Sequence, residues 1–317
     1  MSKGKSPLDP LTESEIVDAV AASGYPLEIR LLKAFTDGGM DPTIGFRVSS
    51  APGESREIDI LASLIEHVAP GDGRLITIQL RLVIEAKSLE PGAAFIGFPW
   101  NQPTTHEMRV HRMHFGGLPS NRVIRELRRD SDTINGAGGL SEAFDALNDA
   151  TVCVQWSVAR RTKPGNEQRP IANHDDSFWQ GLDGTVRAAH TLMLEHSTYK
   201  WTPTNYLVIF ELPVLAVATP NLWLLDATAP SQPPPLQPVQ HLILGRMFQL
   251  EEHVEYRLVD VVSEAGVPAL ITACKSVITE LKSRVAANAY ALMSIGDQQR
   301  ADLDALRLQR LVAEREL

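Results

Sequence analysis

The pattern of apolar residues in the first part of the chain predicts two helices followed by three strands. A Thr-x-x-Glu capping box opens the first helix, over 13–23, and leucines at helical spacing define the second, over 26–37. Three runs rich in β-branched residues follow, and they predict strands over 43–50, 56–64 and 74–87. The chain therefore begins with helices that can cover one face of a β-sheet.

Strict alternation along 56–64 divides its side chains between the two faces of the sheet. It places Glu57, Asp59 and Leu61 on one face. Ile58 and Ile60 then fall on the other face. An acidic side chain is therefore expected among apolar neighbours in the second strand.

The end of the third strand carries an acid and a base on one face. The alternation over 74–87 points Glu85 and Lys87 to the same side, opposite the side of Ile84. Charged groups inside apolar strands cost free energy to bury unless they are neutralised. A divalent cation held by Asp59 and Glu85, with Lys87 beside it, would neutralise them.

These residue types suit metal-assisted cleavage of phosphodiesters. A bound Mg²⁺ or Mn²⁺ can supply a nucleophilic water, stabilise charge on the phosphate and assist the leaving oxygen, and such hard cations prefer oxygen ligands. Asp59, Glu85 and the main-chain carbonyl of Ala86 are the candidate ligands. Lys87 would orient the attacking water. Glu28, expected to point from the second helix toward the sheet, would complete the shell through a water or hold a second ion.

The same residues carry a resemblance to a known family. Glu28 follows Gly-Tyr-Pro on a predicted helix, Asp59 ends Arg-Glu-Ile-Asp, and Glu85 and Lys87 belong to Ile-Glu-Ala-Lys. Over residues 24–88 this order resembles the PD-(D/E)xK nuclease superfamily, whose pattern is a helical Glu, a strand Asp, and an acid-x-Lys on the next strand. The resemblance implies a Mg²⁺-dependent nuclease acting on DNA, less often RNA. It also implies an α/β restriction-endonuclease-like core, with a central mixed β-sheet flanked by helices.

The rest of the chain continues as a mixture of strands and helices. Further strands are expected over 151–159 and 206–218, and further helices over 177–195 and 267–284. The predicted organisation is a disordered leader over 1–11, one nuclease-like domain over 12–296 with a long irregular insertion over 89–150 after the active-site strand, and a helical tail over 297–317.

Two accessory residues have simpler alternatives. Glu57 shares the predicted face of Asp59, but a structural ion pair with Arg56 or Arg81 is the preferred interpretation. Gln155, on the strand after the insertion, could reach the site, although a buried amide that satisfies backbone groups is the preferred interpretation.

The net charge of −9 hides two basic segments. Six arginines lie between positions 106 and 129, and a second basic group lies between 160 and 169. Solvated helix and loop faces are one explanation, and a phosphate-binding surface is the other. The candidate nucleic-acid contacts are Arg109, Arg112, Arg125, Arg128, Arg129, Arg160 and Arg161.

Composition narrows the class of protein. Hydrophobic residues make up 44% of the chain, yet no apolar run is long enough to predict a membrane span, and the N-terminus lacks the pattern of a signal peptide. Two distant cysteines predict neither a disulfide framework nor a zinc knuckle, so a cytoplasmic protein is expected.

The favoured function is a metal-dependent DNA nuclease of defence or DNA repair and processing. The sequence shows no recognisable helix-turn-helix, zinc finger or ATPase loop, so targeting by a partner or control by homodimerisation is expected. The alternative is a catalytically inactive nuclease-fold subunit that binds nucleic acid or protein.

Overall fold

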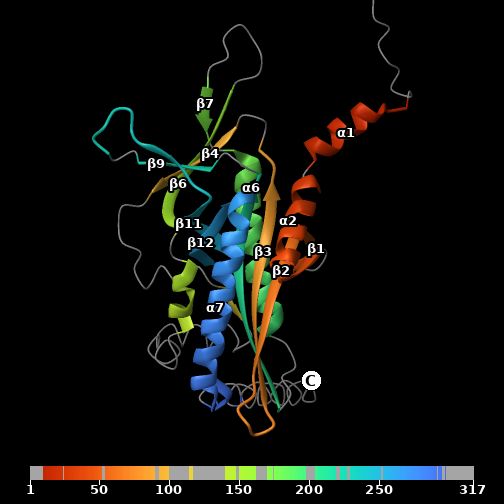
Figure 1. The fold of residues 1–317 in the computed structure, drawn as a ribbon, viewed down its shortest axis with the longest axis vertical. Helices are drawn as coiled ribbons and strands as arrows, with labels where there is room; N and C mark the ends of the chain where they lie inside the picture. Colours follow the sequence, from red (N-terminus) through yellow and green to blue (C-terminus); the bar gives the residue numbers. More distant parts are fainter. Residues whose placement is uncertain are drawn as a thin grey trace, which may run out of the picture.

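A single mixed β-sheet with helices on both faces forms the body of the protein, seen here in a computed structural model (Figure 1). The structure describes residues 10–23, 25–51, 54–89, 93–99, 114–116, 140–147, 150–161, 170–173, 175–197, 204–218, 222–226, 229–250, 253–290, 292–294 and 297. The predicted leader over 1–11 and tail over 297–317 fall almost entirely outside these ranges.

The two predicted N-terminal helices are confirmed. α1 spans Glu13–Ala22, and Thr12 and Glu15 form the expected capping box, each side chain bonding to the other residue's backbone N–H. α2 spans Tyr25–Asp37 and buries Leu27, Leu31 and Phe35. Since these three residues recur at helical spacing, one face of α2 lies against the sheet.

The three predicted strands form one half of the sheet. β1 (Asp41–Ala51), β2 (Glu54–Val68) and β3 (Leu75–Lys87) are joined in sequence order as antiparallel neighbours. β8 (Asn205–Val217) then lies parallel to β3 over the whole length of β3. β12 (His253–Ser263) in turn lies parallel to the end of β8.

Beyond β12 the sheet continues with shorter strands. Its full order is β1-β2-β3-β8-β12-β11-β6-β4-β9-β10, with β5 paired to β8 and β7 paired to β6. The added strands are β11 (His241–Leu250), β6 (Thr151–Arg161), β4 (Ala94–Pro99), β9 (Leu222–Leu225), β10 (Leu236–Pro238), β5 (His114–Gly116) and β7 (Pro170–Asn173).

The expectation of an irregular insertion over 89–150 was wrong for three segments. β4 and β5 lie within it, as does a 3₁₀ helix, η1, over Leu140–Leu147. β4 is held by aromatic packing, because Phe95 stacks on Trp156 at a centroid distance of 5.4 Å and also contacts Phe178. These partners lie far along the chain, so the short apolar run of β4 gave little local sign of a strand.

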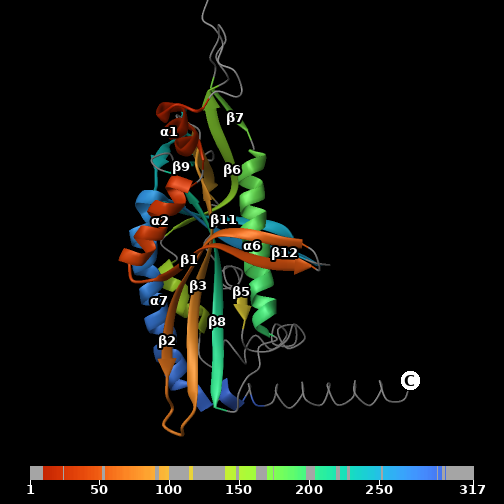
Figure 2. The ribbon, with the colours of Figure 1, turned by 90° about the vertical axis from the view of Figure 1, so that its right-hand side faces the viewer.

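The long helices lie on opposite faces of the sheet (Figure 2). α2 and α7 (Val267–Ala287) cover one face, and a short 3₁₀ helix, η2 (Glu264–Gly266), joins β12 to α7. α6 (Asp176–Ser197) covers the other face. No helix within the described ranges is both long enough and apolar enough to cross a membrane.

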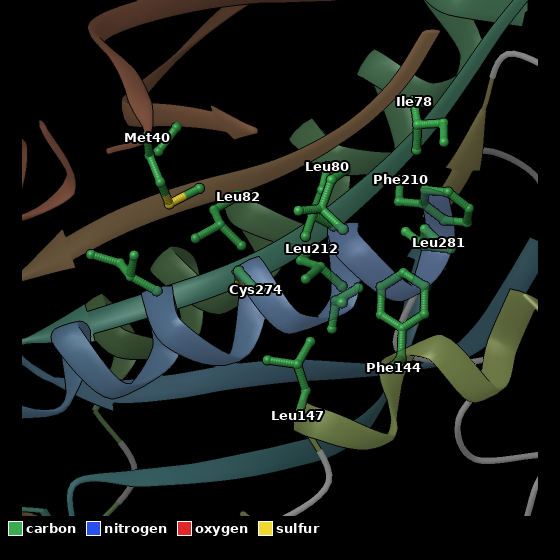
Figure 3. Packing of buried hydrophobic residues seen from close by; sticks show 14 of the residues in the cluster. Met40, Ile78, Leu80, Leu82, Phe144, Leu147, Phe210, Leu212, Cys274 and Leu281 are labelled. Atoms are coloured by element: carbon green, nitrogen blue, oxygen red, sulfur yellow. The ribbon is translucent and has the colours of Figure 1, made fainter. Parts of the chain in front are cut away.

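The larger core lies between β3, β8 and α7 (Figure 3). Leu80 and Leu82 of β3 and Leu212 of β8 face Cys274 and other apolar residues of α7. η1 closes the edge of this cluster with Phe144 and Leu147. β3 is therefore anchored on its α7 side, which leaves its other face to present Glu85 and Lys87 toward α6.

Candidate active site at the carboxyl end of β3

β2 bends next to Asp59. Ile58 and Leu61 both belong to the apolar cluster that contains Ala188 of α6, whereas Ile60 packs with α2 and α7 on the opposite face. The prediction that Ile58 and Ile60 share a face was therefore wrong, because a regular strand would not place residues 58 and 61 on one side. Across the hairpin, Gly45 of β1 has φ +62°, a conformation that favours glycine and allows the bend.

The bend separates β2 from β3 where the predicted site begins. The last register pair between the two strands is Ile60 with Ile84. One residue further on, Asp59 Oδ2 accepts a hydrogen bond of 2.7 Å from the backbone N–H of Ala86. The N–H and C=O of one strand residue project to the same side, so the Ala86 carbonyl is directed toward Asp59 as well.

Glu85 and Lys87 lie on one face of β3, as the alternation predicted. Lys87 Nζ donates to Glu85 Oε1 at 2.7 Å. The side chain of Glu85 is 13% exposed and that of Lys87 28% exposed, so solvent still reaches this ion pair. The lysine is thus held beside the carboxylates without being sealed from a substrate.

The three predicted acidic residues interact electrostatically. Burial is the main cause that raises the pKa of Asp59 and of Glu85, and the charge of Asp59 raises the pKa of Glu85 further. The Ala86 N–H opposes the shift at Asp59, and Lys87 opposes it at Glu85. Burial also raises the pKa of Glu28, followed by the charges of Asp59 and Glu85. A cation among these groups would stabilise their charged forms.

The residues present suit a hydrated divalent cation. Within the described ranges, no group of three or more His, Cys, Asp or Glu side chains is positioned to hold a metal ion. The available donors are therefore the carboxylates of Asp59 and Glu85 and the carbonyl of Ala86. Mg²⁺ commonly keeps several waters and binds through one or two carboxylates, so this donor set fits it. A contact from Glu28 through a water stays a prediction.

α6 packs over the side of the site that carries Lys87 and Arg56. The sequence did not predict that this helix lies there. A Cβ on Gly181 would lie 2.8 Å from Lys87 Cε, and a Cβ on Gly184 would overlap the guanidinium of Arg56. Arg56 Nη2 also donates to the carbonyl of Gln180 at 3.0 Å. The available sequence signal was a pair of glycines inside an otherwise helical pattern, since glycine destabilises helix interiors.

Glu57 has a different partner from the ones expected. It is exposed and pairs with Arg47 of β1, at 3.6 Å between Arg47 Nε and Glu57 Oε2. Arg81 is occupied by Glu211 of β8, in an ion pair with both side chains buried. Arg56 donates to the Gln180 carbonyl of α6 instead, so both predicted pairings of Glu57 were wrong.

Gln155 neither joins the site nor forms a buried amide. It is an exposed residue of β6, which pairs with β11 and β4. In the sheet order, β8, β12 and β11 stand between β3 and β6. The strand that lies beside β3 is β8, which comes later in the chain, so sequence order misplaced Gln155.

The candidate nucleic-acid arginines are mostly outside the described residues. Arg160 lies on β6 and pairs with Asp175 at 3.4 Å. Arg161 ends the same strand, and its side chain is outside the described part of the structure. The others outside the described ranges are Arg109, Arg112, Arg125, Arg128 and Arg129.

Comparison of the chain with protein-family models, with curated proteins and with solved structures gave no significant match.

Proposed function

We propose that this protein is a Mg²⁺- or Mn²⁺-dependent nuclease that hydrolyses phosphodiester bonds of DNA. The observation that carries the proposal is the gathering of Asp59, Glu85 and Lys87 where β2 leaves β3, with the Ala86 N–H bound to Asp59. The helical Glu28 interacts electrostatically with both carboxylates. This arrangement agrees with the resemblance to PD-(D/E)xK nucleases and supports a restriction-endonuclease-like core.

Each residue has a distinct part in the proposed reaction. Asp59, Glu85 and the Ala86 carbonyl would hold the metal, which when bound supplies Lewis acidity at the phosphate and a more acidic water. Lys87 orients the attacking water and stabilises negative charge on the phosphate. Glu85 restrains Lys87 through their hydrogen bond. Glu28 would complete the shell of the metal through a water or hold a second ion.

Nicking of supercoiled plasmid tests the proposal directly. The full-length protein should convert supercoiled to open-circular DNA in Mg²⁺ or Mn²⁺, and EDTA should stop the reaction. Asp59→Ala should lose at least a hundredfold in rate, on the order of the loss of a charge-stabilising group. Glu66→Ala is the matched control, since Glu66 lies on the same strand and pairs with Lys282 of α7.

The control should cleave at the wild-type rate. Wild-type protein that binds DNA without cutting it under any of these conditions would contradict the nuclease assignment. That result would support a nuclease-fold binding subunit instead.

A further inference from the structure

We propose that Arg56 is a second cationic group of this site and binds a phosphate of the nucleic-acid strand, held in place by α6. This inference rests on the proposed nuclease function and deepens it. Sequence reasoning placed Arg56 next to Glu57 and gave it no part in the site. The bend of β2 brings it to α6 instead.

The contact between Arg56 and α6 depends on a glycine of α6, Gly184, which has no side chain. Arg56 Nη2 donates to the Gln180 carbonyl at 3.0 Å. The guanidinium occupies the space that a Cβ on Gly184 would fill. Glycine inside a helix costs about 1 kcal/mol relative to alanine, so α6 gives up stability at the place where the arginine lies. The guanidinium thereby lies directly against the backbone of α6.

A second glycine repeats this arrangement for the lysine of the site. Gly181 lies three residues before Gly184, and positions three apart share one helix face. A Cβ on Gly181 would come within 2.8 Å of Lys87 Cε and 3.4 Å of Glu85 Cγ. α6 therefore presents two adjacent positions without side chains, one against each cation.

The two cations differ in how their charge is balanced. Lys87 is bound to Glu85, whereas Arg56, within the part of the chain that the structure describes, donates to a neutral carbonyl and forms no ion pair. Its charge still acts on the site, because it opposes the rise that burial causes in the pKa of Asp59 and of Glu85. A positive charge that no carboxylate contacts among the described residues is available to an anion.

The ligand chemistry follows from the guanidinium. Arginine offers five N–H donors in a planar fork that matches the oxygens of a phosphate, and one donor here is used by Gln180. A phosphodiester backbone is therefore the ligand class. A backbone contact of this kind carries no base preference, so Arg56 should affect all sequences equally.

Binding of labelled duplex DNA to Arg56→Gln tests the proposal. Fluorescence anisotropy is measured with Ca²⁺ in place of Mg²⁺, since Ca²⁺ also takes oxygen ligands. We expect binding about tenfold weaker, and a plot of log affinity against log salt whose slope is smaller by about 0.9, the value for one lost phosphate contact. Arg284→Gln removes an equal charge on α7, beside Glu280, and should leave both measurements unchanged.

Two further variants separate position from charge. Gly184→Ala keeps the arginine but fills its place on α6, and we expect the same loss of affinity with a native circular dichroism spectrum. Arg56→Lys keeps the charge without the fork and should recover part of the affinity.

The outcomes distinguish this inference from the function on which it rests. If the wild type cleaves DNA while Arg56→Gln keeps the wild-type affinity and salt slope, the Arg56 proposal is overturned and the nuclease assignment stands. If the wild type neither binds nor cleaves, both proposals are overturned.

Discussion

Gly45 lies across the β1–β2 hairpin from Asp59, because its neighbours Ile44 and Phe46 pair with Ile60 and Ile58. Its φ of +62° is a left-handed conformation that other residues adopt at a cost. The bend at this point lets β2 separate from β3, and Asp59 then bonds to the Ala86 N–H. A residue without a side chain on one strand thus lies opposite the carboxylate that the next strand directs toward β3.

Gly45→Ala should therefore impair both stability and the site. We expect a loss of about 1–2 kcal/mol in the free energy of unfolding, from the left-handed backbone, and slower plasmid nicking, from displacement of Asp59. Urea unfolding and the nicking assay measure the two effects. Gly71→Ala is the control, since Gly71 has φ +96° in the β2–β3 turn with open space around it.

The control should lose similar stability and keep its activity. Equal nicking rates for Gly45→Ala and the wild type would show that the bend does not position Asp59.

Lys87→Ala should abolish most cleavage while leaving the fold intact. The lysine is partly exposed, and solvent also reaches Glu85, its hydrogen-bond partner. Removal of the lysine therefore leaves the Glu85 carboxylate in contact with water. We expect a rate at least a hundredfold lower and an unchanged circular dichroism spectrum. Lys282→Ala, at an exposed ion pair on α7, should retain the wild-type rate. Full activity of Lys87→Ala would remove the lysine from the mechanism.

Asp59→Asn should make the metal-free protein more stable at neutral pH. Burial raises the pKa of Asp59, so between the unfolded-state and folded-state pKa values the folded protein holds more protons. The contribution of Asp59 to the stability of the wild type is full below the unfolded-state pKa. It is lost as pH rises through the folded-state pKa. Denaturant unfolding at about pH 4 and about pH 7.5 should therefore show the variant's advantage at the higher pH.

Mg²⁺ should reduce the stability advantage of Asp59→Asn over the wild type. An ion present at ten times its dissociation constant stabilises the wild type by about 1.4 kcal/mol, and Asp59→Asn should gain less. An equal gain from Mg²⁺ in both proteins would mean that Asp59 is not a ligand.

The buried side chains of Arg81 and Glu211 should be energetically coupled across the β3–β8 interface. The two residues are register partners on these parallel strands, with side chains 7% and 0% exposed. Glu211→Leu should cost about 3–5 kcal/mol, since it leaves a buried guanidinium charge. The double variant Arg81→Met/Glu211→Leu should recover much of this loss in urea unfolding. A double variant as unstable as the single one would show that the pair is not coupled.

Local patterns predicted the elements of the site well. Alternation placed Glu85 and Lys87 on one face of β3, and helical spacing gave the buried face of α2. Both inferences depend on neighbours a few residues away, where period and capping act. The α/β class with a large mixed sheet was confirmed for the same reason.

Features set by distant contacts were not predicted. Gln155 was assigned near the site because its strand follows the insertion, but β8 takes the place beside β3. The partner of Glu57 was missed because Arg56 donates to the Gln180 carbonyl of α6, while Arg47 of the neighbouring strand pairs with Glu57. Sequence alone does not reveal which later element will lie against an earlier one.

The wall of the site has a consequence for how the chain matures. Gly181 and Gly184 come long after Lys87, beyond the whole insertion, so a ribosome finishes the acid-x-lysine strand well before the helix that encloses it. A nascent chain or a proteolytic fragment that ends before α6 contains every residue of the motif but lacks the surface that holds Arg56. The phosphate contact that we propose for Arg56 would then form only after α6 has been synthesised.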